Sequence, residues 1–262
     1  MGCVWRQFNS ARPDQKMKKI EISVIQGTEE IVLKKIDQKY NPVVKIHPNI
    51  SIVTINGDYI ASDYNYLKCA LSVTDQQTSI KLDKRDWRVA KVAAGINPAL
   101  AEIMCELAQI KDGDVILDPF CGAGAIPISV LLNHKAQTAI AADISGFATS
   151  CTRKNGLAAG LGKELISITS DIAELKLGNQ SIDIIISNLP FGIRTGSHKE
   201  NIYSYQALAE KAKLWLKPNG KMILLSQEVK LVHEIFGDYK LIKDLPTYHR
   251  GINPHIFMFQ SN

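Results

Sequence analysis

The sequence lacks long hydrophobic runs. A transmembrane helix requires about 18 consecutive apolar residues, and no apolar stretch in the 262-residue chain is that long. We therefore expect no membrane span. The segment Met1–Arg6 also lacks the apolar core of a secretory signal peptide. Together these absences favour a cytoplasmic protein that does not act at a membrane.

Cysteine is also scarce, and no two cysteines form a Cys-x-x-Cys pair. The five are Cys3, Cys69, Cys105, Cys121 and Cys151. Zinc sites and disulfide frameworks need closely spaced or paired cysteines, so neither is predicted, and we expect no bound metal. Scattered free cysteines fit the reducing conditions of the cytoplasm.

Basic residues are present in excess, but the excess is confined to the first third of the chain. Residues 1–91 contain 15 Lys and Arg against 10 Asp and Glu, which accounts for the whole net charge of +5. A modest basic excess is compatible with nucleic-acid binding. Charge alone is equally compatible with ordinary solvated lysines.

One stretch near the middle predicts a ligand site. Residues 114–117 read as a short buried strand that leads to Asp118, and Gly122 and Gly124 then form the turn into a helix. Glycines at such a turn let a ligand approach the backbone and the helix N-terminus. The spacing Asp-x-x-x-Gly-x-Gly differs from the Gly-x-Gly-x-x-Gly turn of nicotinamide sites, which argues against a dehydrogenase.

Strand and helix patterns alternate after this stretch and predict a mostly parallel α/β sheet. A helix over residues 97–110 precedes the stretch, with Asn97 as its N-cap and Pro98 in its first turn. The later helices are predicted over 147–159 and 203–216. The later strands are predicted over 138–142, 166–169, 182–186, 221–225, 239–244 and 255–260.

The N-terminal part predicts a small α+β unit. Its expected elements are a strand over 1–12, helical segments over 17–25 and 28–38, strands over 42–46 and 50–55, and a hairpin turn at Asn56-Gly57 with a return over 58–61. The unit is thin for an independent core and its first strand begins at once, so we expect a truncated module. We divide the chain into residues 1–62, a linker over 63–91, and a main domain over 92–262.

Three acids fall at the ends of successive predicted strands, namely Asp118, Asp143 and Asp171. Each alone reads more simply as a helix cap or a loop carboxylate. Together with the glycine turn they outline an adenosine-containing ligand, with Asp143 accepting hydrogen bonds from ribose hydroxyls and Asp171 from the adenine amine. Asp118 would shape the loop near a positively charged end of the ligand.

The fourth strand ends in the turn Asn188-Leu189-Pro190-Phe191-Gly192. A tight turn with a core phenylalanine is the simpler interpretation. The functional one is a clamp for a planar base with an exocyclic amine, in which Asn188 Oδ1 and a neighbouring carbonyl accept the two amine hydrogens and Phe191 stacks on the ring. This orientation directs the amine lone pair at an electrophile, and in-line transfer depends chiefly on such positioning.

With Asp118–Ile126 and Asn188–Gly192 together, the chain resembles the S-adenosylmethionine-dependent amino-methyltransferases of the Rossmann-like class. The variant Asn-Leu-Pro-Phe-Gly is similar to the guanine-N2 branch that modifies tRNA and ribosomal RNA. Residues 85–101 resemble that family's entry helix, and residues 1–62 loosely resemble the latter part of a THUMP domain, an RNA-binding module. The resemblance implies a mostly parallel sheet whose last strand is antiparallel.

The resemblance also implies a role for each matching position. The residues implied to bind S-adenosylmethionine are Asn97, Asp118, Cys121, Gly122, Gly124, Asp143, Ile144, Asp171, Ile172 and Asn188. Those implied to hold the target base are Asn188, Leu189, Pro190 and Phe191. Candidate RNA contacts are Arg6, Arg12, Lys84, Arg85, Arg88 and Arg194. Ala125 is a departure, because the family often has a hydroxyl residue at that position.

We therefore expect a tRNA guanosine N2-methyltransferase that acts as a monomer or weak oligomer. One alternative keeps the chemistry and changes the substrate, to guanine-N2 of ribosomal RNA or adenine-N6 of a nucleic acid. Another is a truncated homologue that binds cofactor or RNA without catalysing transfer. The short N-terminal part and Ala125 motivate this last alternative, and the intact Asn188–Phe191 turn opposes it.

Overall fold

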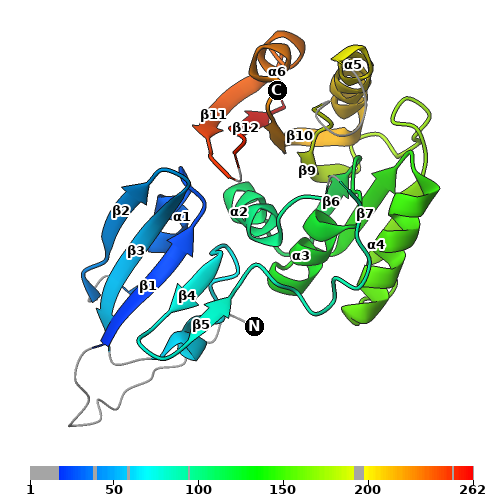
Figure 1. Ribbon diagram of the computed structural model, residues 1–262. Helices are drawn as coiled ribbons and strands as arrows, with labels where there is room; N and C mark the ends of the chain where they lie inside the picture. The colour runs from blue at the N-terminus through cyan, green and yellow to red at the C-terminus, as the bar shows by residue number, and fades with distance from the viewer. Residues whose placement is uncertain are drawn as a thin grey trace.

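The computed structural model describes residues 18–37, 40–57, 60–93, 95–191, 198–249 and 251–261. A five-stranded N-terminal sheet lies beside a larger unit built on a seven-stranded sheet (Figure 1). No helix within the described ranges combines the length and the hydropathy that a membrane span requires.

The N-terminal sheet is antiparallel throughout, with the strand order β2-β3-β1-β4-β5. Its strands are β1 (Lys18–Val24), β2 (Val43–His47), β3 (Ile50–Gly57), β4 (Ser72–Thr74) and β5 (Ser79–Lys81). Two short helical segments complete the unit, α1 (Glu29–Leu33) and the 3-10 turn η2 (Ala61–Tyr64).

Three expectations for this region are wrong. Residues 18–24 form β1 rather than a helix, because alternate residues enter the core and the strand pairs with β3 along its whole length. Asn56 and Gly57 belong to β3, opposite Lys19 and Lys18, so they do not form the expected hairpin turn, and Ala61 begins η2. Asp58 and Tyr59 of the expected return lie outside the described residues. The expected linker over 63–91 contains β4 and β5, so the sheet extends past residue 62. The strand expected over 1–12 lies outside the described residues.

The C-terminal sheet has the order β11-β12-β10-β9-β6-β7-β8. Its strands are β6 (Val115–Asp118), β7 (Thr138–Asp143), β8 (Leu165–Thr169), β9 (Ile182–Asn188), β10 (Leu216–Ser226), β11 (Lys240–Pro246) and β12 (His255–Gln260). Neighbours from β8 to β10 pair in parallel, and β12 pairs antiparallel with β10 and β11. The predicted mostly parallel sheet with an antiparallel last strand is confirmed.

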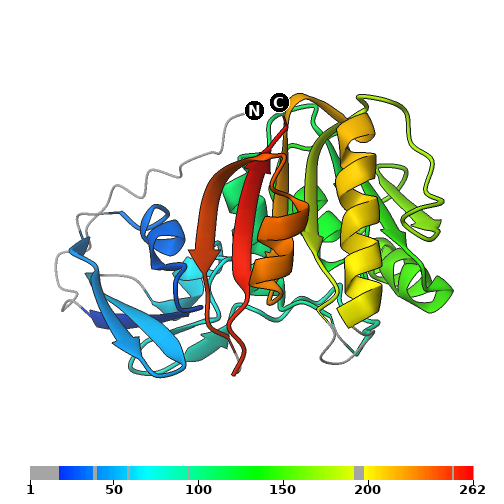
Figure 2. The same cartoon turned by 90° about the horizontal axis from the view of Figure 1, so that it is seen from above.

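Helices cover both faces of this sheet, because successive strand residues point in opposite directions. Ile184 and Ile186 of β9 pack in the core on the side of α2 (Pro98–Ala108) and α3 (Ala125–Asn133). The intervening Ile185 packs with α5 (His198–Trp215) and α6 (Val229–Ile235). Figure 2 shows α5 and α6 together on one side of the sheet. A further helix, α4 (Gly146–Ala158), contacts β7 and β8.

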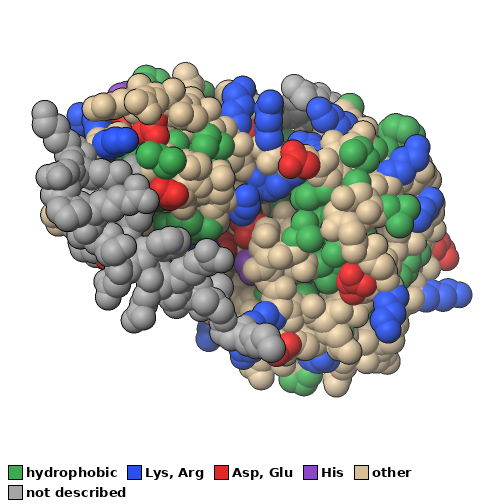
Figure 3. Space-filling model, turned by 90° about the horizontal axis from the view of Figure 1, so that it is seen from below, with side chains coloured by type: hydrophobic (Ala, Val, Ile, Leu, Met, Phe, Trp, Pro, Cys, Tyr) green, Lys and Arg blue, Asp and Glu red, His purple; other side chains and the backbone are tan. Residues whose placement is uncertain are grey.

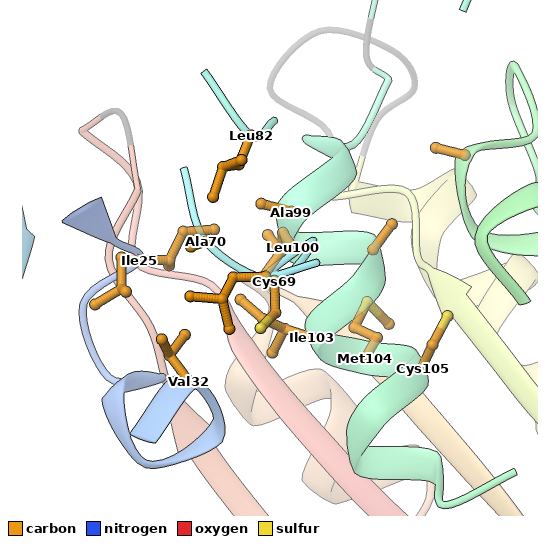
Figure 4. Close-up of a cluster of buried hydrophobic side chains, with 14 of the residues drawn as sticks. Ile25, Val32, Cys69, Ala70, Leu82, Ala99, Leu100, Ile103, Met104 and Cys105 are labelled. Atoms are coloured by element: carbon orange, nitrogen blue, oxygen red, sulfur yellow. The ribbon is translucent and has the colours of Figure 1, made fainter. Parts of the chain in front are cut away.

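Helix α2 lies between the two units and contributes to a core that both supply. Its buried Leu100 and Ile103 lie in one apolar cluster with Val32 and Cys69 of the N-terminal unit (Figure 4). Ile186 of β9 belongs to the same cluster. The predicted cap is confirmed, since the Asn97 side chain accepts a hydrogen bond from the Ala99 amide at 2.8 Å. The two sheets therefore share a continuous hydrophobic interior.

A second connection joins the units through the segment between β11 and β12. Tyr248 forms a backbone bridge with Gln26, donating its amide hydrogen to the Gln26 carbonyl at 3.1 Å. The Tyr248 hydroxyl also donates to Asn49 Oδ1 at 2.7 Å. The C-terminal strands and the N-terminal sheet are therefore held together by polar contacts as well as by α2.

Candidate active site

Asp118 and Asn188 end the two strands between which the order of the sheet reverses. From β6 the chain continues to β7 and β8 on one side, whereas β9 and β10 lie on the other. In open α/β sheets, ligands bind outside the carboxyl ends of the strands at such a reversal. The loop after β6 and the turn after β9 both leave the sheet at this point.

Asp118 ends β6 and is buried. Its Oδ1 accepts hydrogen bonds from the Ser187 hydroxyl at 2.6 Å and from the Phe120 amide at 3.2 Å. Burial raises the pKa of this carboxyl to about 7, because the charged form loses its hydration in the interior. Asp118 therefore organises the loop and exchanges its proton near neutral pH.

The glycines of the loop serve different purposes. Both have left-handed backbone angles, with φ of 54° at Gly122 and 80° at Gly124. A Cβ on Gly124 would lie 2.8 Å from Cγ2 of Thr152, so Gly124 permits the close approach of the loop to α4. A Cβ on Gly122 would meet only Val92 Cγ2, at 3.3 Å, and Gly122 keeps the backbone accessible beside a pocket.

Asp143 joins the end of β7 to the glycine loop. One carboxylate oxygen accepts the Gly122 amide hydrogen and the other the Ser145 amide hydrogen, each at 2.9 Å. Each oxygen has two lone pairs, so both retain capacity for a further donor. The next residue, Ile144, is 70% exposed and presents an apolar side chain beside this carboxylate.

Asp171 follows β8, and its Oδ1 is already engaged. It accepts the Ala173 amide hydrogen at 2.8 Å and the Tyr203 hydroxyl hydrogen at 3.3 Å. The neighbouring Ile172 is buried. Tyr203 lies on α5, far from Asp171 in the sequence, and no local pattern indicated this contact.

The turn after β9 contains a buried side-chain oxygen, Asn188 Oδ1. Asn188 Oδ1 is buried, and no donor from the described part of the chain reaches it. Leu189 is fully buried and its amide donates to the Leu225 carbonyl at 3.0 Å, while the Pro190 carbonyl accepts the Tyr205 hydroxyl hydrogen at 2.8 Å. Phe191 is partly exposed. The turn therefore presents an acceptor that no group within the described residues satisfies.

A pocket connects the two strand ends. Residues that line it include Arg88 and Ile96 from the segment before α2, Asp118, Cys121 and Gly122 from the loop, and Asn188 from the turn. The pocket thus combines one cationic and one acidic side chain with an unpaired amide oxygen. These side chains would suit a ligand that carries both signs of charge and that lies partly next to Asn188.

Two predicted site residues have structural partners instead. Asn97 uses its Oδ1 to cap α2, and its Nδ2 donates to Asp83 Oδ2 at 2.9 Å, so its amide is engaged outside the pocket. Arg85 donates to the carbonyls of Lys68 at 2.8 Å and of Leu82. These contacts hold the segment between β5 and α2 against the N-terminal unit and the start of α2.

The other candidate RNA contacts divide between the surface, the pocket and the undescribed segments. Lys84 is exposed, and Arg88 lies at the pocket. Arg6, Arg12 and Arg194, and also Gly192 of the turn, lie outside the described residues.

A cluster of possible metal ligands lies at the junction of the units. Ligand atoms of Glu102, Glu106 and His134 all lie within 4.8 Å of one another. However, Lys35 pairs with Glu106 at 2.6 Å and Asn133 donates to Glu102 at 2.7 Å. Protein partners therefore already engage both carboxylates, and the cluster is a polar network between α2, α3 and the N-terminal unit.

Comparison with known proteins agrees with this geometry. Residues 85–245 match the family model described as the RMKL-like methyltransferase domain. The chain is 33% identical over 135 residues to the U6 snRNA (guanine-N(2))-methyltransferase THUMPD2 of Bos taurus, which is 52% of this chain and 26% of that protein. It is 34% identical over 148 residues to the tRNA (guanine(6)-N(2))-methyltransferase THUMP3 of Mus musculus, which is 52% of this chain and 29% of that protein.

An archaeal relative matches over a longer segment. The tRNA (guanine(10)-N2)-dimethyltransferase of Methanocaldococcus jannaschii is 29% identical over 171 residues, which is 62% of this chain and 45% of that protein. The chain thus spans less than half the length of these relatives.

A solved structure resembles the fold as a whole. TrmN from Thermus thermophilus superimposes with a TM-score of 0.80 over 94% of this chain and 100% of that chain, at 16% sequence identity. Similarity at this level of identity supports the fold alone. The family match covers the helix before the glycine loop, both strand ends and the pocket between them. The chain therefore belongs to the RMKL-like methyltransferase-domain family.

Proposed function

We propose that this protein transfers a methyl group from S-adenosylmethionine to the exocyclic N2 of a guanosine in RNA, with tRNA as the first candidate substrate. The buried Asn188 Oδ1 beside the pocket, which has no hydrogen-bond partner among the described residues, carries the proposal. An unsatisfied buried acceptor costs free energy, and a ligand that supplies the missing donor would offset this cost. An exocyclic amine is such a donor, and several relatives are named guanine-N2 methyltransferases.

The pocket fits the amino-acid end of the cofactor. Arg88 supplies a positive charge that matches a carboxylate, and Asp118 in its ionised form matches an ammonium group. Gly122 leaves room for close contact with the backbone. S-Adenosylmethionine, when bound, would supply an electrophilic methyl group on its sulfonium. Arg88 would orient the carboxylate end, a role that differs from the RNA contact expected of it from the sequence.

The neighbouring strand ends fit the nucleoside part. Asp143 retains lone pairs for ribose hydroxyls while it holds the Gly122 amide. Ile144 and Ile172 would flank the adenine, and Asp171 would accept from the adenine amine through Oδ2, since its Oδ1 already has two donors. This arrangement orders the cofactor across three adjacent strand ends.

The turn after β9 would hold the target base. Asn188 Oδ1 and the Leu189 carbonyl would accept the two amine hydrogens, and Phe191 would stack on the ring. With both hydrogens held, the amine lone pair points toward the methyl group, and the displaced proton leaves to solvent during or after transfer. A base reaches this turn only after it leaves its stack, and Phe191 replaces part of the lost stacking.

The N-terminal sheet and the segment between β5 and α2 are our proposed RNA contacts. The N-terminal third carries the whole basic excess, and the exposed Lys84 and Lys91 lie on this segment. Figure 3 shows Lys and Arg side chains gathered along the junction of the two halves of the molecule. A THUMP-like role for the sheet, contacts from Arg6, Arg12 and Arg194, and a cytoplasmic location belong to this proposal.

The RNA class has a specific alternative. One relative that matches half of the chain is named for U6 snRNA rather than tRNA. The turn and the pocket recognise a base and a cofactor, and they contain nothing that separates these two RNA classes. A small nuclear RNA is therefore the second candidate substrate.

The test is methyl transfer from labelled S-adenosylmethionine to total tRNA, to ribosomal RNA and to U6 snRNA, followed by nucleoside analysis. We expect labelled N2-methylguanosine in tRNA. The same nucleoside in another RNA would keep the chemistry and change the substrate, and label in N6-methyladenosine would overturn the guanine assignment. If no RNA acquires label while S-adenosylhomocysteine binds, the non-catalytic alternative replaces our proposal.

A further inference from the structure

A series of buried hydrogen bonds from α5 and β10 holds the turn after β9. Tyr205 of α5 is fully buried, and its hydroxyl donates to the Pro190 carbonyl at 2.8 Å. The same hydroxyl lies 2.7 Å from Ser226 Oγ, which accepts the Glu228 amide hydrogen at 3.0 Å. Because Tyr205 has one hydrogen and gives it to Pro190, Ser226 donates to Tyr205. The Tyr205 and Ser226 hydroxyls are thereby both satisfied as donors and as acceptors.

This arrangement determines which acceptors remain at the turn. The Leu189 amide is bound to the Leu225 carbonyl of β10, and the Pro190 carbonyl is bound to Tyr205. Within the described residues, no donor reaches the Leu189 carbonyl or Asn188 Oδ1. Two acceptors thus remain on adjacent residues, which is the number that an exocyclic amine needs.

The tyrosine itself is held in place by its surroundings. Its ring lies in the apolar cluster under α5 and α6, with a centroid 6.3 Å from that of Phe236. Burial raises the pKa of the hydroxyl, so it remains a donor throughout the neutral pH range. A fixed ring and a permanent donor hold the Pro190 carbonyl in one orientation.

We propose that Tyr205 is a positioning residue, which fixes the backbone of the Asn188–Phe191 turn so that Asn188 Oδ1 and the Leu189 carbonyl face the target amine together. This inference rests on the proposed amine transfer. Tyr205 touches neither the base nor the cofactor and acts through Pro190 alone. Misplacement of a reacting group by about 1 Å can cost about 100-fold in rate, so loss of this support should appear in turnover.

The test is Tyr205→Phe, which removes the hydroxyl and keeps the ring. Tyr239→Phe is the matched control, since Tyr239 contacts the same Phe236 and its buried hydroxyl donates to the Ala209 carbonyl at 2.7 Å, away from the turn. We expect a similar fall in Tm for both variants. Turnover should fall about 10- to 100-fold in Tyr205→Phe only, with KM for RNA and affinity for S-adenosylhomocysteine within about twofold of wild type.

Ser226→Ala distinguishes the hydrogen bond between Ser226 and Tyr205 from the one between Tyr205 and Pro190. It removes the donor to Tyr205 and keeps the bond from Tyr205 to Pro190, so its turnover should lie between those of wild type and Tyr205→Phe. Equal turnover in Tyr205→Phe and Tyr239→Phe would overturn the positioning role.

A protein-only measurement separates this inference from the proposed activity. The carbonyl carbon-13 shift of Pro190 should move upfield in Tyr205→Phe and stay unchanged in Tyr239→Phe. An unchanged shift in Tyr205→Phe would refute the hydrogen bond, whatever the activity. If the shift moves but the wild type methylates no RNA, the proposed function is wrong, whereas the hydrogen bond from Tyr205 to the Pro190 carbonyl is confirmed.

Discussion

The two adjacent strands β6 and β9 end in opposite ways. After β6, the polar groups satisfy one another: Asp118 binds Ser187, and the Gly122 amide binds Asp143. After β9, Asn188 Oδ1 is buried without a donor from the described residues. Under our proposal, contacts within the protein fix the loop after β6, whereas the target base supplies the donor that the turn after β9 lacks.

Asn188→Ala should have the largest effect. It removes the acceptor for the target amine, and loss of one preorganised hydrogen-bonding group of this kind costs about 100- to 1,000-fold in kcat. Affinity for S-adenosylhomocysteine should stay within about twofold, measured by calorimetry beside single-turnover methyl transfer. Asn201→Ala is the control, because Asn201 also has a buried, unpaired Oδ1 but lies on α5. Comparable turnover in wild type and Asn188→Ala would refute the amine clamp.

Asp143→Ala should show the reverse pattern. It removes the proposed ribose acceptor and releases the Gly122 amide, and hydrogen bonds to a charged group contribute about 1.5–3 kcal/mol each. We expect affinity for S-adenosylhomocysteine to fall about 30- to 100-fold by calorimetry. Asp114→Ala, which alters a carboxylate at the other end of β6, should leave affinity unchanged. Unaltered affinity in Asp143→Ala would mean that the ribose lies elsewhere.

Arg88→Met should have a smaller effect that depends on the ligand. If Arg88 binds the carboxylate of the cofactor, S-adenosylhomocysteine should bind about 10-fold more weakly, from the loss of one charge-assisted hydrogen bond. Methylthioadenosine, which has no amino-acid end, should bind equally to both proteins. An equal loss for both ligands would indicate that Arg88 only supports the shape of the pocket, where its Nη2 would lie 2.9 Å from a Cβ added to Gly95.

The smallest effect concerns pH. The pKa of Asp118 is raised to about 7 in the folded protein, above its unfolded value, so the folded state holds this proton more tightly. Stability from this group is therefore present at low pH and is lost as pH rises from about 4 to about 7. Asp118→Asn should gain on the order of 1–2 kcal/mol of unfolding free energy relative to wild type between pH 5.5 and pH 8, measured by urea unfolding. A constant difference across this range would refute the shifted pKa.

The sequence predicted those parts of the site whose signals are local. Acids at strand ends and glycines at a strand-to-helix turn follow from patterns within a few residues, and the sheet that contains them was predicted correctly. Ser187, Tyr203 and Tyr205 were missed because their partners lie 15 to 69 residues away in the chain. Such contacts depend on how elements pack, which no short pattern encodes.

The N-terminal errors have a related cause. Residues 18–24 become a strand because β3, more than 25 residues later, pairs with them along their full length. The Asn56-Gly57 dipeptide is a strong hairpin signal in isolation, but pairing with β1 continues through both residues. Tertiary pairing overrides local propensity in both cases.

Helix α2 shows that the boundary of the family match differs from the boundary of the folded core. Family resemblance begins at residue 85, whereas the apolar interior that contains α2 begins at Ile20. A chain cut at the start of the family match would expose Leu100 and Ile103 to water. The segment that the family shares is therefore smaller than the unit that unfolds cooperatively. The intact chain should show a single cooperative transition in calorimetry.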